Sequence, residues 1–235
     1  MKRTIKTILL FSLAIFMMTG VCGCMNNKLS TGHQKMMDYI NQKYDDTFTF
    51  VSVYGGSPGS EIHKIWVSSE AYPDRLISVM GYEENGSLLF CDNYLSVKYE
   101  TQTIELLHSI FDRYGKEVKI LYQASNLACT KGGSNDTTFA EYIAERSSMI
   151  DFTAIISSDE KADQSIVEEI QKDIQNAGLC CSGKIYFSTN HPDLDSITQD
   201  NIYKQYSGKK EYDAYLYLYM TGTDSFETVR WEDNK

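Results

Sequence analysis

The stretch from Tyr212 to Met220 constrains the fold more than any other part of the chain. Tyrosines alternate in it with small or aliphatic residues, and successive side chains of a β-strand point to opposite faces of a sheet. The pattern therefore predicts a strand over 213–221 with one aliphatic face and one tyrosine face. The aliphatic face, which we expect in the core, consists of Ala214, Leu216, Leu218 and Met220.

The tyrosine face of this strand is the most distinctive candidate for a binding surface. It carries Tyr215, Tyr217 and Tyr219, with roughly 7 Å between neighbouring side chains on the same face. Such a row of phenols can stack on sugar rings or hold an extended peptide. The alternative is a face that a helix covers, with the hydroxyl groups reaching its rim. Full burial of all three side chains under a helix would exclude a binding surface.

The first half of the body is expected to be a helix followed by a meander of three or four strands. Asn85-Gly86 lies between two β-rich runs, and a type I′ hairpin turn needs positive φ at both central residues. Met36, Ile40 and Tyr44 repeat every four residues, as on one stripe of an amphipathic helix. The expected elements are a helix over 33–44 and strands over 47–54, 62–69, 75–84 and 87–92.

The clearest helix of the second half is expected over 162–177, where isoleucine recurs at 166, 170 and 174. Ser158 or Asp159 is the expected cap at its start. Gly178 is expected to end it in a Schellman motif, in which Leu179 contacts Ile174.

The rest of the second half alternates short strands and helices. A helix over 101–114 is expected to stop at Gly115 as its C′ residue. The loop over 124–138 is rich in Ser, Asn, Gly and Asp. The other expected elements are strands over 117–123, 152–157 and 184–189, helices over 139–146 and 196–206, and an edge strand over 226–231.

These elements predict an α+β fold, with an antiparallel meander and flanking helices. Hairpins link the strands too often for a doubly wound parallel sheet. The length fits one compact domain or two closely packed small lobes, and a lobe boundary would lie near 115–138.

The charge distribution excludes one large class of partner. Lys2, Arg3 and Lys6 precede residue 24, where there is no acid, so the remainder has 19 basic and 32 acidic residues and a net charge of −13. Nucleic-acid binding needs a basic footprint, and we expect none here. The same charge argues against a body held on anionic lipid by its own surface.

The N-terminal segment has the order of an export signal. A basic start is followed by the apolar run Ile8 to Met18, which is shorter than the roughly 20 residues of a membrane-spanning helix. The run ends in Val21-Cys22-Gly23-Cys24, which resembles the lipobox of bacterial lipoproteins. Cys22 at the −2 position is a mild departure from that pattern.

The resemblance implies that Cys24 receives diacylglycerol on its sulfur and that signal peptidase II cuts after Gly23. Two acyl chains hold a protein stably on a bilayer. The implied organisation is a signal peptide over 1–23, a tether over 24–32 and a globular domain over 33–235, on the extracytoplasmic face of the cell membrane. An uncleaved N-terminal helix and lipidation at Cys22 are the alternatives.

Four other cysteines remain after such a cleavage: Cys91, Cys129, Cys180 and Cys181. An exported protein can oxidise them, whereas a bond between the adjacent Cys180 and Cys181 would strain the backbone. Two complete pairings are open, 91–180 with 129–181 and 91–181 with 129–180. One disulfide with two thiols, or four buried free thiols, are equally open.

No motif predicts a cofactor or a metal. The four histidines lie outside any HExxH pattern, and P-loop and GxGxxG patterns are absent from the sequence. Residues 55–59 (GGSPG) fit GxSxG by letter, but the cluster lies between two β-rich runs and precedes no helix, so we interpret it as a turn. Cys180, Cys181 and His191 match no familiar zinc spacing. The acidic loop over 190–195 lacks the regular spacing of a calcium loop, and a turn that caps the helix after it explains these residues.

The sequence therefore favours a non-enzymatic envelope lipoprotein that binds an envelope protein, a glycan or a peptide. The alternative is a cell-envelope hydrolase that uses carboxylates, for example Glu168, Glu169 or Asp193. Nothing in the sequence selects a pair, because paired catalytic carboxylates need a set separation that sequence does not give.

Overall fold

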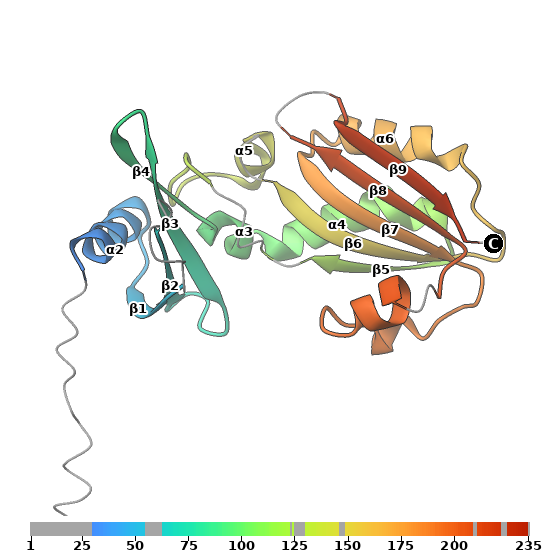
Figure 1. The fold of residues 1–235 in the computed structure, drawn as a ribbon, viewed down its shortest axis with the longest axis horizontal. Coiled ribbons are helices and arrows are strands. Elements are labelled where there is room, and N and C mark those ends of the chain that lie inside the picture. Colours follow the sequence, from blue (N-terminus) through green and yellow to red (C-terminus); the bar gives the residue numbers. More distant parts are fainter. Residues whose placement is uncertain are drawn as a thin grey trace, which may run out of the picture. The chain divides into compact units, whose positions relative to one another are not determined.

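The structure is a computed structural model of the 235-residue chain, and it describes residues 30–54, 63–122, 124, 130–145, 149–208, 211–221 and 225–234 (Figure 1). Residues Gly32–Lys235 form one compact unit. The described residues contain two sheets with helices beside them, which confirms the predicted α+β class.

The first sheet is a four-stranded antiparallel meander in the order β1-β2-β3-β4. Its strands are β1 (Phe48–Val53), β2 (His63–Ser69), β3 (Leu76–Glu84) and β4 (Ser87–Asp92). Asn85 and Gly86 join the last two with φ values of 53° and 75°. The type I′ hairpin predicted from this dipeptide is thus confirmed.

Helix α2 (Thr31–Lys43) packs on this sheet. Met36 and Ile40 are buried, and Tyr44 is buried just beyond the helix end, as their spacing predicts. A Cβ atom at Gly81 would lie 3.0 Å from Met36 Cε, so the missing side chain lets the helix lie close to β3.

Two helices connect the sheets, where the sequence pattern predicted one. Helix α3 (Tyr94–Lys98) precedes α4 (Glu100–Phe111), and Tyr99 forms the turn between them. The helical segment stops at Gly115 as predicted, after the 3₁₀ turn η1 (Asp112–Tyr114), but Gly115 has extended backbone with φ −160° in place of the left-handed conformation common at such a stop. A Cβ atom there would lie 2.6 Å from the Ser157 carbonyl oxygen, so close backbone approach is what requires glycine.

The second sheet has the order β5-β6-β7-β8-β9 and is mixed. Only β6 and β7 run parallel, and α6 (Ile166–Asn176) crosses between them, while the other pairs are antiparallel. The edge position of β9 agrees with the sequence prediction. The strands are β5 (Glu117–Tyr122), β6 (Ile150–Ser157), β7 (Cys181–Ser188), β8 (Ala214–Met220) and β9 (Thr228–Asp233).

Helix α6 ends as predicted and begins later than predicted. The N–H of Leu179 donates to the Ile174 carbonyl at 3.2 Å and that of Gly178 to Gln175 at 2.9 Å, with φ +68° at Gly178. These two bonds form a Schellman motif. The N-terminal boundary residue is Ser165, so the predicted cap at Ser158 or Asp159 is wrong.

The helix predicted over 196–206 is also wrong. The structure has a 3₁₀ turn η2 (Leu194–Ser196) and a π-helical turn η3 (Tyr203–Gly208) instead. The Asn201 side chain accepts from the Thr198 N–H and donates to the Ser196 carbonyl, both at 2.8 Å. Such local bonds satisfy backbone groups without an α-helix and therefore compete with it.

A short helix, α5 (Phe139–Ala144), follows the loop that the sequence predicted over 124–138. Its start is a capping box, in which Thr138 and Glu141 each bond to the other's backbone N–H. Tyr142 is its buried residue, and the Tyr142 hydroxyl donates to Ser96 Oγ of α3 at 3.0 Å.

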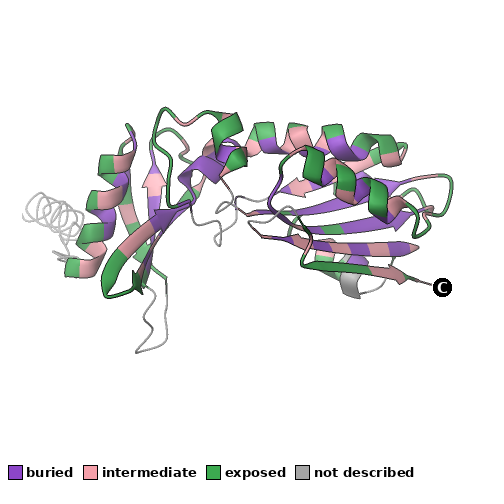
Figure 2. Cartoon of the chain, turned by 90° about the horizontal axis from the view of Figure 1, so that it is seen from above, coloured by how far each residue is buried: buried purple, intermediate pink, exposed green. Residues whose placement is uncertain are grey.

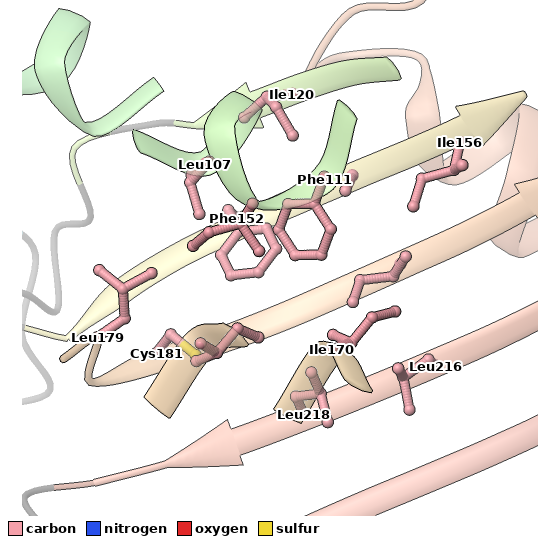
Figure 3. Packing of buried hydrophobic residues seen from close by; sticks show 14 of the residues in the cluster. Leu107, Phe111, Ile120, Phe152, Ile156, Ile170, Leu179, Cys181, Leu216 and Leu218 are labelled. Atoms are coloured by element: carbon pink, nitrogen blue, oxygen red, sulfur yellow. The ribbon is translucent and has the colours of Figure 1, made fainter. Parts of the chain in front are cut away.

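The main core lies between the second sheet and helices α4 and α6 (Figure 3). Leu107 and Phe111 of α4 pack over Phe152, with ring centroids of the two phenylalanines 5.4 Å apart. Ile170 of α6 packs over the middle of the sheet. The aliphatic face predicted for β8 lies here, since Ala214, Leu216, Leu218 and Met220 are all buried in this core.

Candidate functional site

The tyrosine face of β8 lies on the side of the second sheet opposite α4 and α6 (Figure 1). Tyr215, Tyr217 and Tyr219 are all intermediate in exposure, and none is fully buried. The same alternation of buried and partly exposed positions is visible along the strands in Figure 2. The condition that would exclude a binding surface, full burial of all three, is therefore not met.

The segment over 194–212 covers one part of this face. Its Leu194, Ile197, Tyr206 and Tyr212 form a second buried cluster with Ile155 and Tyr186 of the sheet, and Tyr215 packs against that cluster. The Tyr215 ring centroid lies 5.0 Å from that of Tyr186 and 6.0 Å from that of Tyr212. Burial raises the pKa of Tyr215 to about 12. Tyr215 is thus largely a packing residue.

Tyr217 and Tyr219 lie beyond this second cluster. Strand register places Lys184 of β7 and Arg230 of β9 opposite Tyr217, on its two sides. It places Ser182 and Thr228 opposite Tyr219 in the same way. Directly opposed residues of neighbouring strands share a face, so these six side chains lie together on one side of the sheet. We call this group the open face: Ser182, Lys184, Tyr217, Tyr219, Thr228 and Arg230.

The open face carries two exposed cations on an otherwise acidic body. Lys184 is exposed, and the structure gives it no ion pair among the described residues. Arg230 is exposed and pairs with Glu232 of its own strand. Asp151 of β6 is exposed and lies beside Ser182 in the parallel register, so it is a second acid at the border of the open face, besides Glu232.

The cysteines do not form the two complete pairings that the sequence left open. Cys180 and Cys181 are buried free thiols, and Cys180 Sγ donates to the Met220 carbonyl at 3.1 Å. Cys91 is disulfide-bonded. Cys129 lies outside the described residues. Burial raises the pKa of Cys181 to about 12, which keeps the thiol protonated and inert at neutral pH.

A buried carboxylate that the sequence analysis missed lies at the end of β4. Asp92 is fully buried and accepts from Tyr39 Oη at 2.8 Å, Lys43 Nζ at 2.8 Å, Tyr44 Oη at 3.0 Å and the Tyr94 N–H at 2.9 Å. Burial and the Asp92 carboxylate raise the pKa values of both phenols well above the ordinary value. Protonated tyrosines and a fully hydrogen-bonded carboxylate indicate a structural role. We call Asp92 with its partners Tyr39, Lys43, Tyr44 and Tyr94 the Asp92 clamp.

Lys43 completes this clamp and lines a shallow pocket. Its Nζ also donates to Tyr39 Oη at 2.8 Å and to the Thr130 carbonyl at 3.0 Å, which uses the three donors of the ammonium group. The pocket beside it has a volume of about 380 Å³ and is bounded by Lys35, Asp38, Tyr39, Gln42, Lys43 and Phe90. No sequence signal marks Asp92, because the partners lie far apart along the chain.

A serine, a histidine and an aspartate meet where β6 and β7 end. Ser157 Oγ lies 3.0 Å from His191 Nδ1, and His191 Nε2 lies 3.3 Å from Asp159 Oδ1. Lys116 pairs with Asp159 and holds the pKa of that carboxyl below its usual range. Ser157 is fully buried, so its hydroxyl does not reach solvent as a nucleophile must. The cluster instead fastens the loop after β7, where His191 has φ 43°, to β6.

The carboxylates proposed for a hydrolase do not meet in one site. Glu168, Glu169 and Asp193 are all exposed. Glu169 lines a pocket of about 240 Å³ together with Glu160 and Asp163, at the start of α6. Hydrogen bonds from Ser165 lower the pKa of Asp163, so this carboxyl is ionised at neutral pH.

In the described part of the chain, no group of three His, Cys, Asp or Glu side chains gathers closely enough to hold a metal ion. Among the described helices, none has both the length and the apolar character that crossing a membrane requires. The lipobox residues and Cys24 lie outside the described residues.

The comparisons with known proteins add one structural similarity. The chain resembles the crystal structure of a DUF5037 family protein from Ruminococcus gnavus, at 13% sequence identity and a TM-score of 0.41. The alignment covers 83% of this chain and 94% of that one. No family model matches the sequence, and no curated protein matches it.

Proposed function

We propose that this chain is a lipoprotein anchored to the extracytoplasmic face of the cell membrane, and that it binds an envelope ligand or partner without chemistry of its own. The lipobox-like residues 21–24 support the anchor. The open face supports the binding role.

The observation that carries the binding role is the difference between the three tyrosines of β8. Tyr215 packs into the cluster beneath the 194–212 segment, whereas Tyr217 and Tyr219 lie beyond it and stay partly exposed. Aromatic rings on a solvated sheet face expose apolar area that a bound ligand would bury. Hydroxyl and cationic groups on both sides supply the polar contacts that fix orientation.

Site-specific crosslinking in living cells tests the binding role. A photo-activatable phenylalanine analogue at position 219 is expected to capture an envelope component after irradiation. The matched control is the same analogue at position 54, because Tyr54 is exposed and directly follows β1 of the first sheet. Adducts at both positions, or at neither, would contradict a specific role for the open face.

Metabolic labelling with a fatty-acid analogue tests the anchor. Labelling is expected in the unaltered chain and in Cys22→Ala, and its loss is expected in Cys24→Ala, because the thioether needs the Cys24 sulfur. Retained label in Cys24→Ala, or intact mass with Met1 still present and no acyl group, would refute the lipoprotein assignment.

The pocket at the start of α6 keeps a hydrolase as the second candidate, because three carboxylates line it. In that case Glu160→Gln and Glu169→Gln would abolish turnover of an envelope substrate. Turnover of isolated cell-wall material by the purified protein, lost in these variants and kept in Tyr217→Ala, would favour the hydrolase over the binding protein.

A further inference from the structure

We propose that the open face binds an acidic glycan, with Tyr217 stacked on a sugar ring and Lys184 and Arg230 paired with its carboxylates. This inference rests on the proposed binding function and names the class of ligand.

The residues directly opposite Tyr217 on the two neighbouring strands form a row across the sheet, and the composition of this row supports an acidic ligand. Lys184, Tyr217 and Arg230 come from three neighbouring strands and lie directly opposite one another. Neighbouring strands are separated by about 4.8 Å, so the backbone positions of the two cationic residues lie at about that distance on each side of Tyr217. A ligand that stacks on the ring would therefore present its substituents to a cation on either side.

The next row across the sheet has Tyr219 at its centre and supports a sugar ligand. Ser182 and Thr228 lie opposite Tyr219 on its two sides, so two hydroxyl groups take the place of the two cations. A hydroxyl group both donates and accepts a hydrogen bond, as the hydroxyls of a sugar require. Tyr217 and Tyr219 are roughly 7 Å apart along β8, so the two rings can contact successive sugars of one chain.

The distribution of charge also supports an acidic ligand. Residues 24–235 carry a net charge of −13, yet the row across Tyr217 contains two cations and no acid. The background charge repels polyanions from the rest of the surface, so an anionic ligand is favoured only where cations gather. Arg230 pairs with Glu232, but the five N–H donors of a guanidinium leave several for a ligand.

The negative charge of Asp151 allows a test of whether the ligand is acidic. Asp151 lies beside Ser182 on the same face and has no cation opposite it in the parallel register. An acid at this position repels a carboxylate bound to Lys184, so its removal should improve binding of an acidic glycan and leave a neutral glycan unaffected.

Calorimetric titration of the full-length protein in non-ionic detergent micelles tests the proposal. The probes are oligogalacturonate, alginate and hyaluronan oligosaccharides, together with fully methyl-esterified oligogalacturonate as the uncharged counterpart. Binding of at least one acidic oligosaccharide, weakened by added salt and absent for the methyl ester, is the expected result. Failure of all three acidic probes to bind would overturn the inference.

Variants then assign the contact. Tyr217→Ala is expected to weaken binding about tenfold, because the stacking surface is lost. Lys184→Ala should weaken it by about fivefold, and Asp151→Asn should strengthen it by about twofold. Lys172→Ala is the matched control, because Lys172 is an exposed lysine on α6, which covers the other face. Thermal melts of each variant confirm that the fold is retained.

Two results would overturn the glycan class and keep the binding function. One is equal binding of the acidic and the methyl-esterified oligosaccharide with loss in Tyr217→Ala, which would indicate a neutral glycan. The other is a protein adduct at position 219 in cells, with no oligosaccharide bound in the titration. Binding that Tyr217→Ala and Lys184→Ala leave unchanged would place the glycan elsewhere and would contradict both proposals.

Discussion

One buried polar residue, Asp92, connects the elements around the first sheet. Asp92 lies where no water can solvate it, and four donors satisfy its carboxylate. The acceptor and the donors come from α2, β4 and α3, so one side chain joins three elements. The Asp92 carboxylate stabilises the folded state mainly because its removal would leave buried donors without hydrogen-bond partners, which raises the free energy of the folded state.

Asp92→Ala is therefore expected to lower the free energy of unfolding by about 3–5 kcal/mol, because it leaves the Lys43 ammonium buried without its counter-charge. Urea unfolding followed by circular dichroism measures the change. Asp38→Ala is the control, since Asp38 is an exposed aspartate of the same region, and its cost should be within about 0.5 kcal/mol. A similar cost for both variants would contradict the clamp.

Cysteine chemistry also belongs to this scale. Cys180 and Cys181 are buried thiols and Cys91 is disulfide-bonded, so we expect Cys129 to be the partner of Cys91 in a chain with Cys22 and Cys24 replaced by serine. Such a chain should contain two thiols, those of Cys180 and Cys181. They should resist alkylation in the native protein and react fully in denaturant without reductant. Four reactive thiols before reduction would show that Cys91 is not oxidised.

At two glycines, the packing of neighbouring strands leaves no room for a side chain. Gly183 lies in the central strand β7, and a Cβ atom there would lie 2.6 Å from Cζ of the buried Phe152 ring. Gly115 has the same role beside β6. Both glycines occupy extended backbone, so they serve packing and not turn geometry.

Gly183→Ala is expected to destabilise the protein by about 1–3 kcal/mol, because the added methyl forces the Phe152 ring from its place in the core. The control is Ser182→Ala, since Ser182 belongs to the same strand and faces the other side. Thermal unfolding compares the two. If Gly183→Ala were as stable as Ser182→Ala, the core would have room that the structure does not indicate.

For the whole molecule, the burial of several tyrosines should make the free energy of unfolding decrease at high pH. Burial raises the pKa values of Tyr114, Tyr206, Tyr215 and Cys181 to about 12. Each group is neutral in its folded environment, and an unfolded tyrosine ionises near its ordinary pKa of about 10. The stability that the tyrosines contribute is complete below pH 10 and is lost as the pH rises toward 12, whereas the contribution of Cys181 begins to fall near its ordinary pKa of about 9.

The unfolding free energy should therefore fall between about pH 10 and pH 12, while the absorbance of ionised tyrosine rises late. Tyr206→Phe should make this fall less steep, because it removes one of the groups that ionise only on unfolding. Urea titrations at stepwise pH measure the slope. A flat profile from pH 10 to 12 would contradict the burial of these phenols.

Sequence patterns predicted correctly those elements that depend on interactions between residues close together in the chain. Alternation over 213–221, the Asn85-Gly86 turn and the Schellman end at Gly178 each depend on a few adjacent residues, and the structure contains all three. The α+β class followed from their sum. The helix predicted over 196–206 failed because the Asn201 side chain satisfies nearby backbone groups in a tighter turn.

Tertiary structure alone decided which tyrosine of β8 is covered and which is open. Periodicity treats Tyr215, Tyr217 and Tyr219 as equal, because it records only the face of the strand. Among the three, only Tyr215 packs against the cluster that includes Leu194, Ile197, Tyr206 and Tyr212, so the difference depends on contacts between residues far apart in the chain. The burial of Asp92 and the parallel pairing of β6 with β7 are non-local for the same reason.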